Sequence, residues 1–288
     1  MSRKPSASGR FPIVFNPKLG YIDRPMEVAC GQCIGCRLER ARQMGVRAVH
    51  EAKCHAANSY LTLTYDEEHL PRDLSLRPVE LQKFWKRLRA RITPMKIKYV
   101  ACGEYGEDLT RPHYHACLFG YRPDDLRFWK DSKGHDLYRS AFLEKVWKKG
   151  MVFVGDVTFQ SASYVAGYCL KKVNGDRADE HYKRVDVETG EIFWILPEYI
   201  VVSNGIGKEW FERFHSDWYR DGSCVVDGRK AKTPLYYDRK YAELYPERMQ
   251  EIRREREVRA IKSDDNSPRR LKDREVVKRA EKKIFGHK

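Results

Sequence analysis

Two histidines separated by one residue, in a run typical of a β-strand, constrain this chain more than any other feature. The run is Arg111–Phe119, which is short, aromatic and apolar, and in which Pro112 fixes the entry. Alternate residues of a strand point to the same face, so His113 and His115 project side by side while Tyr114 points to the other face. Two neighbouring imidazoles are a potential pair of metal ligands, although histidines in strands are often packing residues.

A second β-prone run supplies a carboxylate. Lys96–Cys102 has strand character, and the turn-rich segment Gly103–Asp108 connects it to the histidine strand. Glu104 stands where the first strand ends, so we expect it to face His113 and His115 across the ladder. The predicted metal site therefore has two imidazoles and one carboxylate. Non-haem iron oxygenases use the same set of ligands, so this trio does not by itself identify the chemistry.

The charge of the chain narrows the choice of partner. Lysine and arginine number 56 against 41 acidic residues, which gives a formal net charge of +15 and a pI near 9.4. Such a surplus favours a polyanionic partner, most often nucleic acid. No run of eighteen apolar residues is present, and residues 1–27 are expected to form a basic arm rather than a secretory signal. We therefore expect no contact with a membrane and a reducing compartment for the eight cysteines.

A dense cysteine and glycine segment near the N-terminus predicts a second metal site. Cys30, Cys33 and Cys36 recur at intervals of three, and the intervening glycines allow the turn that lets sulfurs converge. A closed structural Zn²⁺ site needs a fourth ligand, for which Cys54 is the first choice, with the nearby His50 and His55 as further candidates. The spacing also resembles the start of an iron–sulfur run without its fourth cysteine and proline, and the cysteines can equally bind no metal.

Two segments are expected to be basic helices. Residues 37–57 combine a stripe of small residues with several arginines, and Pro78–Ile92 is strongly amphipathic. The polar face of the second helix carries Lys83, Arg87 and Arg91, which either contact DNA phosphates or are solvated. Asp124–Trp129 is expected to begin a polar connector.

A further helix, Ser161–Lys172, carries two tyrosines. Tyr164 and Tyr168 are four residues apart, so their hydroxyls leave one face about 6 Å apart along the axis. Lys171 and Lys172 follow within one turn. Tyrosines at this spacing are usually packing residues, so this helix gains meaning only beside the metal site.

The C-terminal segment is basic. Residues 239–288 contain 17 basic and 10 acidic residues. We expect a tail that is helical near Glu243–Ile261 and mobile over its final twenty residues, and that adds nonspecific affinity for nucleic acid.

In this order the pieces resemble the replication-initiator endonucleases that carry a His–hydrophobic–His (HUH) motif and a tyrosine nucleophile. The closer resemblance is to the rolling-circle replication initiators of microviruses, in the gokushovirus branch. Tyr114 departs from the usual aliphatic residue between the histidines. The matching segments are Cys30–Arg37, Tyr60–Thr64, Gly103–Gly106, Arg111–His115 and Tyr164–Tyr168.

The resemblance implies an α+β fold, a palm-like HUH endonuclease domain in which a central antiparallel sheet is flanked by helices. We expect this domain over residues 28–238, with the tyrosine helix against the metal face. The ligands His113, His115 and Glu104 would hold Mg²⁺ or Mn²⁺, and His ligands tilt the preference toward Mn²⁺.

The implied activity is a metal-dependent endonuclease and strand transferase. Tyr164 or Tyr168, assisted by Lys171, would attack single-stranded origin DNA, form a 5′-phosphotyrosine and later allow rejoining, which starts and ends rolling-circle replication of a small circular phage genome. Lys172 would contact DNA. A host helicase and DNA polymerase would act beside it in the bacterial cytoplasm. The alternatives are a nonenzymatic single-stranded DNA-binding protein, which would bind without cleaving, or a plasmid or transposon HUH endonuclease.

Overall fold

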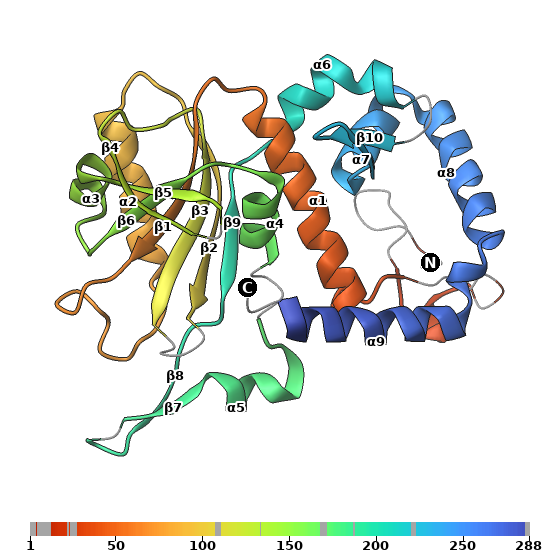
Figure 1. Ribbon diagram of the computed structural model, residues 1–288. Helices are drawn as coiled ribbons and strands as arrows, with labels where there is room; N and C mark the ends of the chain where they lie inside the picture. The colour runs from red at the N-terminus through yellow and green to blue at the C-terminus, as the bar shows by residue number, and fades with distance from the viewer. Residues whose placement is uncertain are drawn as a thin grey trace.

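A seven-stranded antiparallel sheet organises the chain. The computed structural model describes residues 4, 13–21, 23, 28–106, 111–132, 134–167, 172–186, 188–219 and 223–285. Helices α1 and α4 lie on one face of this sheet, α2 and α3 lie on the other, and α6 to α9 form a group beyond α1 (Figure 1). The predicted fold class, α+β with a central antiparallel sheet flanked by helices, is confirmed.

The strands of the large sheet follow the order β4-β5-β6-β1-β3-β2-β9, and two short hairpins, β7-β8 and β10-β11, stand apart from it. The strands are β1 (Asn58–Thr64), β2 (Lys98–Tyr105), β3 (Pro112–Phe119), β4 (Leu126–Asp131), β5 (Asp136–Ser140), β6 (Val152–Gly155), β7 (Lys183–Val185), β8 (Ile192–Trp194), β9 (Tyr199–Val202), β10 (Ser223–Val226) and β11 (Arg229–Lys232).

The helices are amphipathic and bury one side against the sheet or against each other. They are α1 (Ile34–Ala52), α2 (Pro78–Arg91), α3 (Ala141–Trp147), α4 (Phe159–Gly167), α5 (Ala178–Tyr182), α6 (Lys208–Trp218), α7 (Leu235–Leu244), α8 (Pro246–Ile261) and α9 (Pro268–Phe285), with 3₁₀ turns at Pro17–Leu19, Gly175–Arg177 and Asp264–Asn266.

Side-chain alternation along β3 divides the interior into two cores. Tyr114 and Leu118 face α2 and α3, whereas Cys117 and Phe119 face α1 and α4. Tyr114 is fully buried, and its hydroxyl contacts the Tyr65 hydroxyl at 2.9 Å. The aromatic residue between the two histidines thus belongs to the core opposite them, which explains why a large side chain is accommodated there.

Two expectations about irregular segments are wrong. Residues 126–140 form the hairpin β4-β5 rather than a connector, with a bulge between Phe128 and Lys130. The pattern was obscured because β4 is an exposed edge strand with little apolar alternation. The final residues form the 18-residue helix α9 instead of a mobile tail, and this helix crosses the N-terminal part of α1 (Figure 1).

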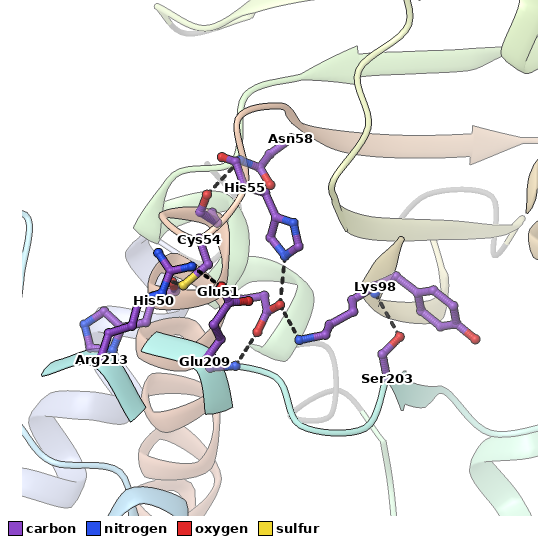
Figure 2. A network of polar contacts seen from close by, with 12 residues as sticks. His50, Glu51, Cys54, His55, Asn58, Lys98, Ser203, Glu209 and Arg213 are labelled. Atoms are coloured by element: carbon purple, nitrogen blue, oxygen red, sulfur yellow. Dashed lines mark hydrogen bonds and ion pairs between the residues drawn. The ribbon is translucent and has the colours of Figure 1, made fainter. Parts of the chain in front are cut away.

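A buried carboxylate ties α1 to the rest of the fold. Glu51 is fully buried, and its Oε1 lies 2.7 Å from Lys98 Nζ on β2 and 2.9 Å from His55 Nε2. The backbone N–H of Gly207, which precedes α6, donates to Glu51 Oε2 at 2.6 Å (Figure 2). This network fixes α1 across the sheet, and α1 in turn supports α4. No helix in the described ranges is both long and apolar enough to cross a bilayer.

Candidate active site

Three donor groups converge on the face of the sheet covered by α1 and α4. Glu104 on β2 pairs directly with His113 on β3, and His115 lies two residues further along the same face. His113 Nε2 is 2.6 Å and His115 Nε2 is 3.1 Å from Glu104 Oε1. The three side chains are nearly buried, with exposed fractions of 3% for Glu104, 18% for His113 and 7% for His115. The structure therefore brings all three predicted metal ligands together.

The second nitrogen of each imidazole is held by a polar partner. His113 Nδ1 lies 3.1 Å from the carbonyl oxygen of Arg111. His115 Nδ1 lies 2.8 Å from the Tyr60 hydroxyl and 3.0 Å from Thr62 Oγ1. Such contacts orient a ring so that its other nitrogen is presented to a ligand. In both histidines that nitrogen is Nε2, which faces Glu104.

Tyr60 and Thr62 are functional candidates that the sequence reasoning missed. They stand on β1, where Thr62 pairs with His115 and Tyr60 with Cys117. The alternation of polar Tyr60 and Thr62 with apolar Leu61 and Leu63 was a usable signal. It did not identify them because the pairing of β1 with the histidine strand is a long-range property.

The electrostatics of the trio favour an anionic carboxylate. Burial acts to raise the pKa of Glu104, but its contacts with His113 and His115 outweigh burial and lower that pKa to about 2. Burial also raises the pKa of Tyr60 well above its ordinary value, so its hydroxyl stays neutral beside His115. Glu104 therefore remains charged throughout the physiological pH range.

The donor set fits a divalent cation. One oxygen and two imidazole nitrogens lie within 4.8 Å of one another, on adjacent strands that cannot move apart easily. A carboxylate with imidazoles suits Mn²⁺, and Mg²⁺ is compatible when water completes the coordination. The choice between these ions stays a prediction.

Tyr164 on α4 lies beside this trio. Its ring is edge-on to that of His115, with centroids 5.3 Å apart and an interplanar angle of 80°. The other face of α4 is buried through Ala162, Val165 and Ala166, whereas Tyr164 is 49% exposed. The phenol therefore lies at the rim of the site and is accessible from outside. Tyr168 and Lys171, the other predicted catalytic residues, lie outside the described residues.

A glycine on α1 permits the close approach of α4. A Cβ built on Gly45 would lie 2.4 Å from Ser163 Oγ and 3.4 Å from Phe159 Cε2. Ser163 directly precedes Tyr164, so the spacing of the two helices determines how close Tyr164 comes to the sheet. The absence of a side chain at Gly45 is thus a requirement of the site.

The predicted DNA-binding residues of α2 lie away from this site. Lys83, Arg87 and Arg91 belong to the helix that covers the opposite face of the sheet. Arg87 donates to the carbonyl oxygens of Val146 and Trp147, at 2.7 and 2.9 Å, and so stabilises the end of α3. A contact between α2 and DNA would therefore involve a surface separate from the site.

The other predicted DNA contact, Lys172, lies near the start of α1. Arg37 Nη2 donates to the Lys172 carbonyl oxygen at 2.6 Å. Its backbone is thus held in place, while a contact between its side chain and DNA stays a prediction.

The cysteine segment forms a cluster of three rather than four. Cys30, Cys33 and Cys36 have sulfurs within 4.8 Å of one another just before and within the first turn of α1. Cys54 follows the other end of this helix, roughly 27 Å away at 1.5 Å per residue, so its assignment to the cluster is wrong. His50 and His55 are equally remote, and His50 is hydrogen-bonded to Tyr237 and Val225. A hydrogen bond from the Cys33 N–H lowers the pKa of Cys30 to about 7.

The arrangement of sheet, metal ligands and helix-borne tyrosine defines an α+β domain of the HUH endonuclease-like kind. Residues 58–173 match the family model for the replication-associated protein ORF2. This segment contains Tyr60, the metal trio and Tyr164.

Named relatives agree over most of the chain. It is 34% identical over 232 residues to replication-associated protein VP4 of Bdellovibrio phage phiMH2K, covering 77% of this chain and 70% of that protein. It is 35% identical over 226 residues to replication-associated protein ORF2 of Spiroplasma virus 4, covering 74% and 67%. It is also 36% identical over 219 residues to replication-associated protein ORF4 of Chlamydia phage 1, covering 72% and 52%. The chain therefore belongs to the replication-associated proteins of these microviruses, as its motifs predicted. No solved structure matches it.

Proposed function

We propose that this protein serves phage genome replication by nicking and rejoining single-stranded origin DNA through a tyrosine. The observation that carries the proposal is the exposed phenol of Tyr164 beside His115, within a trio completed by His113 and Glu104. The net charge of +15 and the names of the relatives support a DNA substrate in the host cell.

The reaction is a transesterification. The Tyr164 hydroxyl oxygen forms a bond to the scissile phosphorus, the bond from phosphorus to the 3′ oxygen breaks, and the phenol proton passes to solvent. The products are a 5′-phosphotyrosine and a free 3′-OH, and attack by a 3′-OH on the phosphotyrosine reverses the step. One ester replaces another, so no ATP is consumed.

The residues around Tyr164 prepare the site for this step. A divalent cation bound by Glu104, His113 and His115 would neutralise charge on a non-bridging phosphate oxygen. Tyr60 and Thr62 orient the His115 ring. Because α4 packs closely on α1, the Tyr164 ring is held at the rim with one side open to the substrate strand.

The strand would approach along the part of the same sheet face that lies beyond β1. In β6 and β5, Phe153 pairs with Arg139, and Phe153 also pairs with Thr62 of the site. Trp129 on β4 is 48% exposed, lies 6.4 Å from Phe153 by ring centroids and carries the Arg139 guanidinium 5.2 Å from its own. Aromatic rings beside cationic groups stack bases and attract phosphates without sequence preference.

The second tyrosine of the helix extends the proposal. Tyr168 follows Tyr164 by one helical turn in sequence, so a second attack at the regenerated origin would release a unit-length circle. Lys171 would help to deprotonate the attacking phenol. A host helicase and polymerase would supply unwinding and synthesis.

The test is the covalent adduct. The full chain is incubated with an origin oligonucleotide and Mn²⁺, and a denaturant-resistant protein–DNA species is sought by gel electrophoresis. We expect the adduct with wild type and none with the Tyr164→Phe, Tyr168→Phe double variant. An undiminished adduct in that variant would exclude these nucleophiles, and binding without scission in wild type would indicate a nonenzymatic binder.

A further inference from the structure

The three sulfurs before α1 have the spacing of metal-bound thiolates. Cys30 Sγ and Cys36 Sγ are 3.9 Å apart, and Cys33 Sγ completes a set within 4.8 Å. Sulfurs about 2.3 Å from a tetrahedral Zn²⁺ stand about 3.8 Å from one another. The cluster thus matches a metal-centred tetrahedron missing one corner, and no fourth histidine, cysteine or carboxylate in the described part of the chain joins it.

The backbone around the cluster is arranged to stabilise negative sulfur. The N–H of Cys33 donates to Cys30 Sγ at 3.3 Å, and the N–H of Cys36 donates to Cys33 Sγ at 3.5 Å. Cys33 is the N-cap of α1, so its sulfur also lies at the positive end of a helix of 19 residues. These are features that favour thiolates, which bind metals, over thiols.

Gly31 makes the turn possible. Its φ is +74°, a left-handed conformation that residues with a side chain rarely adopt. A Cβ at this position would also lie 3.4 Å from Arg40 Nη2. The guanidinium of Arg40 therefore stands close to the knuckle, defined as Cys30–Cys36, and its charge complements a three-thiolate site.

The knuckle contacts the chain that follows the tyrosine helix. Arg37, next to Cys36, donates to the Lys172 carbonyl oxygen at 2.6 Å. Gln32, between Cys30 and Cys33, accepts a hydrogen bond from Asn174 Nδ2 at 3.1 Å. Residues 172–174 are thus attached at two points to the same short segment that presents the sulfurs.

We propose that Cys30, Cys33 and Cys36 bind one Zn²⁺ through their thiolates, and that the metal-bound knuckle anchors residues 172–174 and so positions the exit of the helix that carries Tyr164. Each thiol releases its proton on binding, and an exogenous ligand such as water occupies the remaining coordination position. The metal site stands without the proposed nicking reaction, whereas its positioning role rests on that reaction.

Metal content of the full chain tests the site. The protein is produced without a metal-affinity tag, purified under reducing conditions and analysed by elemental mass spectrometry, followed by Zn²⁺ titration against a chromophoric chelator. Variants are Cys33→Ser and Cys36→Ser, with Cys54→Ser as the matched control because Cys54 lies at the other end of α1. Circular dichroism verifies that each variant is folded.

We expect about one Zn²⁺ per chain in wild type and in Cys54→Ser, and an affinity at least about 100-fold lower in the knuckle variants. Absence of zinc binding in folded wild type, or equal binding in the knuckle variants, would overturn the site. Stoichiometric iron with absorbance near 400 nm in anaerobically purified protein would replace it with an iron–sulfur cluster.

Hydrogen exchange tests the positioning role separately. Peptides covering residues 172–174 are followed before and after chelation of zinc. We expect faster exchange at these residues in the chelated protein and no change in the β4-β5 hairpin, which is remote in sequence and packing. Unchanged exchange at 172–174 would overturn the anchoring role, and this readout does not depend on whether Tyr164 is the nucleophile.

Discussion

The ring of Tyr164 meets that of His115 edge-on, with centroids 5.3 Å apart, while about half of the tyrosine surface stays exposed. A tyrosine held only for packing would be buried between helix and sheet. This one contacts a candidate metal ligand with one side and solvent with the other. That position is what an attacking phenol requires, because the phosphate has to reach both the hydroxyl and the metal site.

Removal of the Tyr164 hydroxyl tests this relationship directly. We expect Tyr164→Phe to lower the rate of adduct formation on the order of 100-fold or more, because phenylalanine retains the ring contact but cannot attack phosphorus. Tyr245→Phe is the matched control, since Tyr245 is also about half exposed but lies between α7 and α8. Equal losses in both variants would show that the effect is not specific to the site.

The two hydroxyls on His115 Nδ1 predict a graded effect on metal affinity. Tyr60→Phe removes a partner at 2.8 Å but leaves Thr62 at 3.0 Å, so we expect a reduction of about tenfold or less in Mn²⁺ affinity. The Tyr60→Phe, Thr62→Val double variant lacks both partners and is expected to lose about 100-fold. Isothermal titration calorimetry with Mn²⁺ measures both. A double variant no weaker than the single one would contradict the orienting role.

Part of this site follows from local sequence rules. Strand alternation places His113 and His115 on one face, and the short connector brings Glu104 opposite them, because these relations depend on neighbouring residues. The role of Tyr60 depends on the pairing of β1 with β3, which joins segments about fifty residues apart. No local pattern specifies that pairing.

Helical periodicity has a similar limit. It separates the buried from the exposed side of α2, but it does not say which face of the sheet the helix covers. Lys83 and Arg91 are consequently on the far side from the candidate active site. For the cysteines, the spacing within Cys30–Cys36 is local and is reproduced, whereas Cys54 is separated from them by the length of a helix that sequence proximity does not reveal.

The contact between α1 and α4 predicts a clash that a second substitution relieves. In Gly45→Ala the new Cβ would lie 2.4 Å from Ser163 Oγ, so α4 must shift and carry Tyr164 with it. We expect a loss of about 1–3 kcal/mol in the free energy of unfolding together with slower adduct formation. Thermal unfolding and the adduct assay measure the two effects.

Removing the obstructing oxygen supplies the control for that experiment. With Ser163→Ala the remaining contacts of the new Cβ are about 3.4 Å or longer, which is ordinary van der Waals contact. The Gly45→Ala, Ser163→Ala double variant should therefore recover most of the stability and rate lost in the single variant. Additive losses in the double variant would show that the Ser163 hydroxyl is not the obstacle.

Glu51 predicts a pH-dependent contribution to stability. Burial acts to raise the pKa of Glu51, but hydrogen bonds from His55, Lys98 and the Gly207 N–H outweigh it and hold that pKa below its ordinary value (Figure 2). A carboxyl group with a lowered folded-state pKa stabilises the fold above its unfolded pKa, and this stabilisation is lost as the pH falls through the folded value. We therefore expect Glu51→Gln to lower the free energy of unfolding at pH 7 by about 2 kcal/mol, because Lys98 loses its charged partner while staying partly buried.

Urea denaturation at several pH values checks both the size and the sign. The difference between wild type and Glu51→Gln should stay constant from about pH 8 to pH 5 and narrow below about pH 4. Glu209→Gln is the control, because Glu209 pairs with Arg213 at an exposed site and should cost about 0.5 kcal/mol or less. A difference that widens on acidification would contradict the lowered pKa and the stabilising role of the carboxylate that fixes α1 across the sheet.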